Sequence, residues 1–178
     1  MKIIIDSSPL IILAKLNLLP SLKNIFQKII IPEIIYNEVV NEGILKGKQD
    51  AIAIKLFIEK EPELIEIIKD VPQIQYDKYQ FELDAGEMAV LNLSKTQQPD
   101  LIIIDEELAR GVARQLGLKF KGTLGVLINL YKANIISFNE LSYYCGIIKS
   151  RKDIWIHSEL IDKVLAELKS KMKNNEKL

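Results

Sequence analysis

Four acidic side chains, Asp6, Glu38, Glu87 and Asp105, have the types and the spacing to bind a divalent metal ion. Asp6 and Asp105 each follow directly on a run of isoleucines, in "KIIID" and "LIIID". Glu38 and Glu87 lie in stretches with helical spacing. The carboxyl ends of parallel strands form the edge at which open α/β sheets bind ligands. The pattern therefore predicts that these acids converge at one edge of a sheet.

Several ionised carboxylates in one cleft repel one another, and a divalent cation can neutralise them. The chain has one histidine, His157, and one cysteine, Cys145, so the ligands would be oxygen atoms, which suit Mg²⁺ or Mn²⁺. Taken singly, an aspartate after a strand is commonly a helix cap or a turn residue, and a glutamate on a helix commonly faces water. Asp84 is expected to cap the helix that carries Glu87 and to share its face.

Basic and hydroxyl side chains close to Asp105 are candidates for substrate binding. Arg110 and Arg114 are four residues apart, so on a helix both project to one side. They could bind phosphate groups or pair with the neighbouring acids Glu106 and Glu107. The stretch "KGTLG" begins a predicted helix near Thr123 and could hold a phosphate at its amides, with close packing of its glycines as the alternative.

Short apolar runs that alternate with helical patterns predict an α/β fold with a mostly parallel sheet. Buried strands are expected at 2–5, 28–31 and 100–105, and further short strands at 64–68 and 118–120. Ser8 is expected to cap the first helix, with Pro9 as its first residue. The other helices are expected at 32–43, 51–61, 84–95, 106–117, 122–133, 138–149 and 158–171, and residues 70–82 as a loop.

The composition is that of one globular domain, expected over residues 1–170, with a frayed tail at 171–178. No apolar run approaches the length of a membrane span, and the single cysteine fits a reducing compartment, so the protein is expected in the cytoplasm without a membrane partner. The formal net charge is zero, with 24 basic and 24 acidic residues. This balance argues against a protein that binds nucleic acid by bulk electrostatics alone.

Five segments occur in the order found in PIN-domain proteins: "IIIDSSPLIILAKLNLLPSL", "IIIPEIIYNEV", "LDAGEMAVLNLS", "LIIIDEELARGVARQLGL" and "GTLGVLINLYKANII". They resemble the branch related to VapC-type toxins whose third motif is L-D-x-G-E, over roughly residues 1–160. The resemblance implies a three-layer α/β/α sandwich. It also implies an endoribonuclease in which Asp6, Glu38, Glu87 and Asp105 hold Mg²⁺ or Mn²⁺ and activate water to cut RNA.

Two positions of this motif pattern leave alternatives open. The segment "DEELAR" carries two adjacent acids, so Glu106 is an alternative to Asp105 as the fourth acid, and Ile104 stands where many relatives have threonine or serine. Ser7 resembles the hydroxyl or amide residue that steadies a metal-bound water. Its structural alternative is to help Ser8 cap the first helix.

The leading hypothesis from the resemblance is the toxin of a toxin–antitoxin pair. Its expected partners are an RNA substrate, a small antitoxin protein and a second copy of the chain, bound through surplus apolar surface at 9–26 and 52–58. A non-catalytic PIN-like module that binds RNA or protein is the alternative, favoured by Ile104 and by the neutral charge. A phosphoacceptor receiver domain is a third possibility, although "DSS" follows the first strand where such domains usually have a pair of acids.

Overall fold

The structure is a computed structural model that describes residues 1–74 and 83–175, with side chains to Met172. It divides into two compact units, residues 1–135 and 136–178, and each is described by itself. Part of the loop expected at 70–82 lies outside the described residues. Among the described residues, no helix is long and apolar enough to cross a membrane.

The first unit is built on a sheet of five parallel strands in the order β3-β2-β1-β4-β5. The strands are β1 (Lys2–Ile5), β2 (Lys28–Pro32), β3 (Ile65–Ile68), β4 (Leu101–Ile103) and β5 (Phe120–Lys121). Ile3, Ile4 and Ile5 of the central strand β1 are fully buried. A strand covered on both faces reads as a continuous apolar run, which is why the sequence predicted it.

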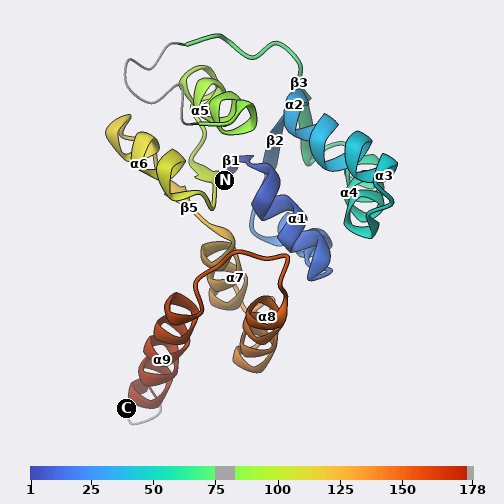
Figure 1. Ribbon diagram of the computed structural model, residues 1–178. Coiled ribbons are helices and arrows are strands. Elements are labelled where there is room, and N and C mark those ends of the chain that lie inside the picture. The colour runs from blue at the N-terminus through green and yellow to red at the C-terminus, as the bar shows by residue number, and fades with distance from the viewer. Residues whose placement is uncertain (75–82, 176–178) are drawn as a thin grey trace. The chain divides into compact units, whose positions relative to one another are not determined.

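Helices complete the first unit. They are α1 (Ser7–Lys15), the 3-10 helix η1 (Leu19–Asn24), α2 (Glu33–Tyr36), the π-helix η2 (Asn37–Glu42), α3 (Gly43–Leu45), α4 (Gln49–Lys60), α5 (Ala85–Gln97), α6 (Glu107–Gln115) and α7 (Thr123–Lys132). Figure 1 shows α1 and α4 on one side of the strands and α5 and α6 on the other. These two pairs are also in contact within each layer. The unit is thus the expected α/β/α sandwich.

The strand order places a topological switch point at the centre of the sheet. From β1 the chain moves outward to β2 and β3, and it then returns to the other side of β1 to form β4 and β5. The direction of winding therefore reverses between β1 and β4. In open α/β sheets, the crevice outside the carboxyl ends of two such strands is the usual place for a ligand.

Ser8 and Gly43 do not have the helix-terminal roles that the sequence predicted. Ser8 does not cap α1: the helix begins at Ser7, two residues before Pro9, with Asp6 as its N-cap residue, and Ser8 is exposed. The second helix does not end at Gly43, because that glycine has helical dihedral angles and is buried. A Cβ atom on Gly43 would lie 2.6 Å from the Ala51 Cβ atom, so the glycine allows α3 and α4 to pack closely.

The second unit contains α8 (Phe138–Ser150) and α9 (Ser158–Asn175), which contact each other. A capping box between Ser137 and Glu140 begins α8. Helix α9 continues to Asn175, beyond the point at which the sequence predicts a frayed tail, and residues 176–178 lie outside the described residues.

Candidate metal centre

Asp6 lies at the switch point between β1 and β4. It follows the last residue of β1, and its backbone N–H donates a hydrogen bond to the Ile103 carbonyl at the end of β4 (2.9 Å). The residue is 4% exposed, and its side chain makes no capping bond to α1. The carboxylate is therefore held by a rigid buried strand and is left for another role.

Ser7 connects Asp6 to Glu38. Hydrogen bonding by its backbone N–H lowers the pKa of Asp6, and hydrogen bonding by its hydroxyl lowers the pKa of Glu38, in each case against the larger effect of burial. Glu38 lies on the π-helix η2, a helix type that is rare and frequently found at functional sites. The first residue of α1 thus acts on two acids from different elements.

The N-terminus of α5 brings Asp84 and Glu87 to the same place. A Cβ atom on the buried Gly86 would lie 3.3 Å from Asp84 Oδ1, 3.8 Å from Asp6 Oδ1 and 3.6 Å from Ile35 Cγ1. Two carboxylates therefore approach the same side of Gly86, which has no side chain to separate them. Only the contact with Asp84 Oδ1 would be tight for such a Cβ atom, whereas that with Asp6 Oδ1 would be an ordinary van der Waals contact.

Burial and mutual repulsion change the ionisation of these groups. The pKa of Asp6 is raised from 3.8 to about 7, first by burial and then by the charges of Asp84, Glu87 and Glu38. Burial and the charge of Asp84 also raise the pKa of Glu38 and of Glu87. The raised pKa values of Asp6, Glu38 and Glu87 thus share the charge of Asp84 as a cause, which shows that the cluster interacts electrostatically.

The donor chemistry of this cluster fits a hard divalent cation. Within the described residues, Asp6, Glu38, Asp84 and Glu87 form no ion pair with a lysine or arginine side chain. In the same part of the chain, no three histidine, cysteine, aspartate or glutamate side chains are close enough together to ligate one ion directly. Mg²⁺ usually retains several waters and is held through one or two carboxylates, so a pair of these acids would be enough to hold it.

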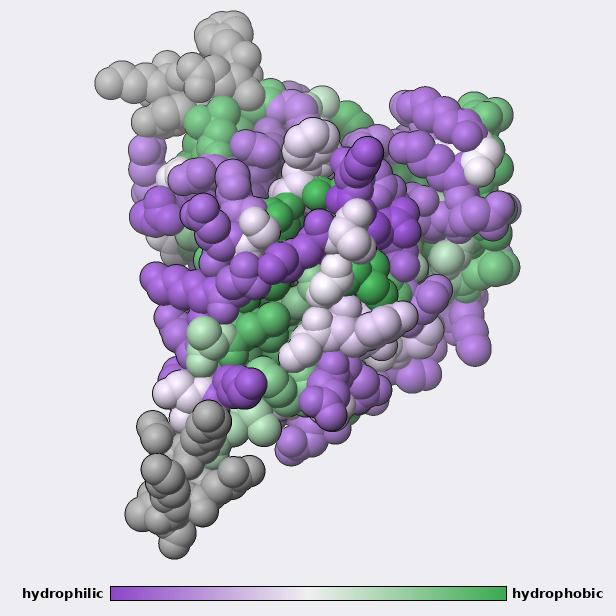
Figure 2. Space-filling view, turned by 60° about the horizontal axis from the view of Figure 1, so that its bottom comes forward, coloured by the Kyte–Doolittle hydropathy of each residue, from purple (hydrophilic) through white to green (hydrophobic). Residues whose placement is uncertain are grey.

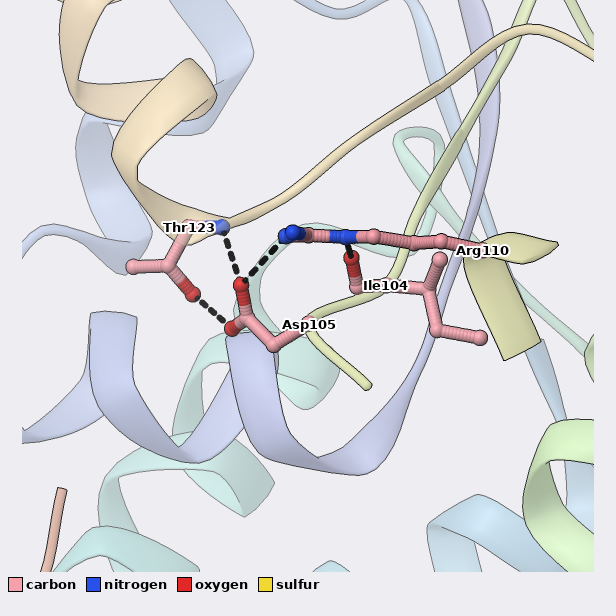
Figure 3. A network of polar contacts seen from close by, with 4 residues as sticks. All are labelled: Ile104, Asp105, Arg110 and Thr123. Carbon is pink, nitrogen blue, oxygen red and sulfur yellow. Dashed lines mark hydrogen bonds and ion pairs between the residues drawn. The ribbon is translucent and has the colours of Figure 1, made fainter. Parts of the chain in front are cut away.

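Asp105 is engaged differently (Figure 3). Its Oδ1 atom accepts hydrogen bonds from the backbone N–H of Thr123 (2.9 Å) and from Arg110 Nη2 (3.2 Å), and its Oδ2 atom accepts one from the Thr123 hydroxyl. Arg110 Nε also donates to the Ile104 carbonyl (2.8 Å). Both carboxylate oxygens are thus bound by the chain itself.

The predicted site residues therefore separate into two groups. Asp6, Glu38 and Glu87 come together, and Asp84, which the sequence indicated only as a helix cap, joins them. Thr123, expected near the substrate, is fully buried against Asp105. The sequence feature that could have identified Asp84 as a member of the cluster is its place in "LDAGE", three residues before Glu87.

The two arginines have partners other than the acids Glu106 and Glu107. Arg110 pairs with Asp105, and the guanidinium of the exposed Arg114 lies over the Phe120 ring, 5.3 Å from its centroid. Glu106 is exposed at the start of α6, and its charge contributes to the raised pKa of Glu87. Of the two adjacent acids, Glu106 is the one that acts electrostatically on the cluster.

Comparison with known proteins gives one family match. The model of the DUF3368 family, described as a PIN domain, matches residues 2–170. Among solved structures, a domain of a functionally unknown protein from Methanocaldococcus jannaschii is similar, with 17% sequence identity and a TM-score of 0.47. That alignment covers 68% of this chain and 89% of that chain. No curated protein matches the chain.

Proposed function

The chain belongs to the PIN-domain family, and from this premise we propose that it is a metal-dependent endoribonuclease that hydrolyses RNA phosphodiester bonds. PIN domains are generally nucleases that use divalent metal ions. The observation that carries the proposal is the cluster of carboxylates beside the switch point, in which Asp6 and Glu87 are buried, Glu38 and Asp84 are exposed, and Asp6 has a pKa of about 7. Buried carboxylates with raised pKa values are typical of functional sites, and a bound cation would offset their repulsion.

In this proposal Asp6, Glu38, Asp84 and Glu87 hold Mg²⁺ or Mn²⁺, directly or through water. When bound there, a divalent ion would supply polarisation of the phosphate and a coordinated water whose pKa is lowered towards about 7. The chain supplies the position and the charge: Asp6 follows directly on the buried strand β1, and the Ser7 hydroxyl favours the ionised form of Glu38 by lowering its pKa. Glu38 or Glu87 can accept a proton from the attacking water, because both have raised pKa values.

The substrate would be held by local contacts, because the net charge is zero. Arg114 over Phe120 offers a cation beside an aromatic ring, a combination that binds phosphate and stacks on bases. Lys119 flanks the same ring in sequence and is exposed. Arg110, by contrast, is committed to Asp105 and Ile104.

The test is cleavage of single-stranded RNA by the purified chain with Mg²⁺, Mn²⁺ or EDTA. We expect cleavage only with a metal ion, and we expect Asp6→Asn to abolish it while thermal unfolding stays cooperative. Glu107→Gln, a charge removal on the exposed first turn of α6, is the matched control and should keep full activity. Cleavage that persists in Asp6→Asn would show that the cluster is not the active site.

We also propose that the nuclease acts as the toxin of a toxin–antitoxin pair and forms a homodimer. Helix α4 exposes Ile52 and Leu56, and the neighbouring α3 exposes Ile44 and Leu45. Figure 2 shows green surface on the right-hand side, where α3 and α4 lie in Figure 1. A mostly apolar groove, lined by Ala14, Leu19 and Pro20 from α1 and η1 and by Ala53, Leu56 and Phe57 from α4, lies beside it.

This groove is made from the two segments whose surplus apolar residues predicted a dimer. Analytical ultracentrifugation of the wild type and of Leu56→Glu checks the dimer, and a monomeric wild type would contradict it. Growth arrest on expression, relieved by a small protein encoded beside this gene, checks the toxin role.

A non-catalytic PIN-like module is the second candidate. It is favoured by the spacing of the acids, since no three of them within the described residues are close enough to ligate one ion directly. Calorimetry with Mn²⁺ separates the two functions. Absence of binding, together with intact RNA after long incubation, would support the module and contradict the nuclease.

A further inference from the structure

We propose that a pocket between α2, the residues that follow β3, and α5 binds a single nucleobase, and that the Asn92 carboxamide recognises the edge of that base. The pocket has a volume of about 580 Å³, within the range of about 300–1,000 Å³ that is usual for small-molecule sites. Its buried amide, its apolar wall and its balanced charge together determine the class of the ligand.

Asn92 is a buried polar residue whose oxygen lacks a hydrogen-bond donor. It lies on α5, lines the pocket and is 2% exposed. Among the described residues, no donor reaches its Oδ1 atom. The other buried polar side chain nearby on α5 is satisfied, because the Ser94 hydroxyl donates to the Val90 carbonyl (2.7 Å). An unpaired buried acceptor is destabilising and rare in proteins, and a ligand with an N–H donor would pair it.

The wall around this amide is largely apolar. Ala85, Met88 and Ala89 share one face of α5 with Asn92, and Ile34 of α2 also lines the pocket. Such a site suits a flat heterocycle, whose faces pack on apolar side chains and whose edge carries donors and acceptors. Adenine is the usual partner of asparagine, since its N6 amine donates to the amide oxygen while N7 accepts from the amide nitrogen. We therefore expect adenine to be the base that binds best.

The charges that line the pocket balance each other. Glu33 and Lys69 are the two charged residues among its described lining residues, and Lys69 Nζ lies 4.0 Å from Glu33 Oε1. Their side chains are 41% and 77% exposed, so both charges remain in contact with water. A pocket without net charge favours a neutral group over a phosphate or a carboxylate. The base of a nucleotide would therefore enter the pocket, and its phosphate would stay outside.

The elements that form the pocket also carry acids of the candidate metal centre. Asn37 and Met88 line the pocket, Glu38 directly follows Asn37, and Glu87 directly precedes Met88. If the proposed function holds, the base belongs to a nucleotide of the RNA near the cleaved bond, because proteins recognise single-stranded RNA through unstacked bases. That step rests on the proposed function, whereas the binding of a base does not. A free nucleotide is the other source of the same chemical group.

An NMR titration of the ¹⁵N-labelled chain with adenosine monophosphate in EDTA tests the pocket without any metal ion. We expect shifts centred on Met88, Ala89 and the side-chain amide of Asn92. The monophosphate of purine riboside has the same ring without an N–H donor, so it leaves the Asn92 oxygen unpaired and should bind about tenfold more weakly. Equal affinity of the two nucleotides, or no shifts at the pocket with adenosine monophosphate, would overturn the proposal.

Substitutions separate recognition of the base from a structural role of Asn92. Asn92→Leu removes an unpaired oxygen, so it should melt at or above the wild-type temperature and bind adenosine monophosphate about tenfold more weakly. A lower melting temperature with unchanged affinity would overturn the proposal. Ala85→Leu, at an exposed position of the wall, keeps Asn92 and narrows the pocket, and should also weaken binding. Ser94→Ala is the matched control, outside the lining residues, and should bind as the wild type does.

Experiments with RNA identify the source of the base and separate this inference from the proposed function. Tighter binding of the dinucleotide ApA than of adenosine monophosphate would support a base within an RNA strand, and equal binding would support a free nucleotide. If the wild type cuts RNA, Asn92→Leu should raise KM for adenine-containing RNA about tenfold with little effect on kcat. Cleavage of RNA without nucleotide binding would overturn this inference alone. Nucleotide binding without cleavage would overturn the proposed nuclease alone.

Discussion

Asp84 and Glu87 cap each other at the N-terminus of α5. Asp84 Oδ1 accepts a hydrogen bond from the Glu87 backbone N–H (2.8 Å), and Glu87 Oε2 accepts one from the Asp84 backbone N–H (2.9 Å). This reciprocal capping box satisfies two backbone donors and fixes the position of both carboxylates. The same three-residue spacing therefore starts the helix and presents two acids to Asp6.

Substitutions at Glu87 separate these two roles. Glutamine can complete a capping box but carries no charge, so Glu87→Gln should melt within about 2 °C of the wild type in EDTA and bind Mn²⁺ about tenfold more weakly. Glu87→Ala should show the same loss of affinity and should also lose about 1 kcal/mol of stability with the cap. Wild-type Mn²⁺ affinity in Glu87→Gln would remove Glu87 from the ligand set.

The metal-free protein should become less stable as the pH rises towards 7. Between pH 3.8 and about 7, folded Asp6 holds a proton that the unfolded chain has already released. The unfolding free energy therefore falls across this window, by at most about 4 kcal/mol from this residue. Urea unfolding in EDTA from pH 5 to pH 8 measures the slope. Asp6→Asn should flatten it, and equal slopes in the two proteins would contradict the burial of an ionisable Asp6.

Metal ions should reverse this loss at high pH. A cation that binds only the folded chain stabilises it by mass action, by about 2.7 kcal/mol at a concentration 100 times the dissociation constant. At pH 8, Mn²⁺ should therefore raise the melting temperature of the wild type by several degrees. Asp6→Asn should respond much less. An equal response of the two proteins would place the bound ion elsewhere.

Gly86→Ala tests whether metal binding depends on the present position of the Asp84 carboxylate beside Gly86. In Gly86→Ala the new methyl group lies 3.3 Å from Asp84 Oδ1, so that carboxylate must move by a few tenths of an ångström. We expect Mn²⁺ affinity to fall severalfold with little change in stability, because alanine also favours the helix. Gly111→Ala is the matched control: it lies within α6 with nothing within 4 Å of a new Cβ, and it should gain about 0.5–1 kcal/mol without changing affinity. Equal Mn²⁺ affinity in Gly86→Ala and Gly111→Ala would show that metal binding does not depend on the close contact between Asp84 and Gly86.

The fold could largely be predicted because its strands are short, continuous apolar runs. The run before Asp6 can be buried only in a sheet covered on both faces, and its repetition at 28–31 and 100–105 indicated a parallel arrangement. The end of the second helix could not be predicted in this way. Gly43 resembles a helix terminus in sequence, but its lack of a side chain serves the contact with Ala51, which is distant in sequence.

The candidate site was predicted less completely, for a similar reason. Strand ends identify Asp6 and Asp105 equally, since each follows an isoleucine run. What distinguishes them is the set of side chains around them: Asp6 faces other acids, whereas Asp105 faces Thr123 and Arg110. The spacing of residues along the chain does not reveal such partners, because Thr123 lies next to Asp105 only through the tertiary packing of α7.

A substitution at Gly122 tests how much the hydrogen bonds around Asp105 contribute to stability. Its φ of −100° and ψ of −176° are extended values that any residue adopts, so Gly122→Ala introduces no backbone strain. The new Cβ would instead overlap the Arg110 guanidinium and Asp105 Oδ1 and force their ion pair apart. We expect the melting temperature to fall by about 5 °C, while Gly146→Ala, which has nothing within 4 Å of a new Cβ, should not lower it.

The double variant Arg110→Ala/Gly122→Ala identifies the cause of that loss. Removing the guanidinium also removes the main overlap, so the two substitutions together should cost clearly less than the sum of their separate effects. Thermal unfolding of the wild type, the two single variants and the double variant gives the coupling directly. Additive losses would mean that Gly122 is required for a reason other than the contact with Arg110.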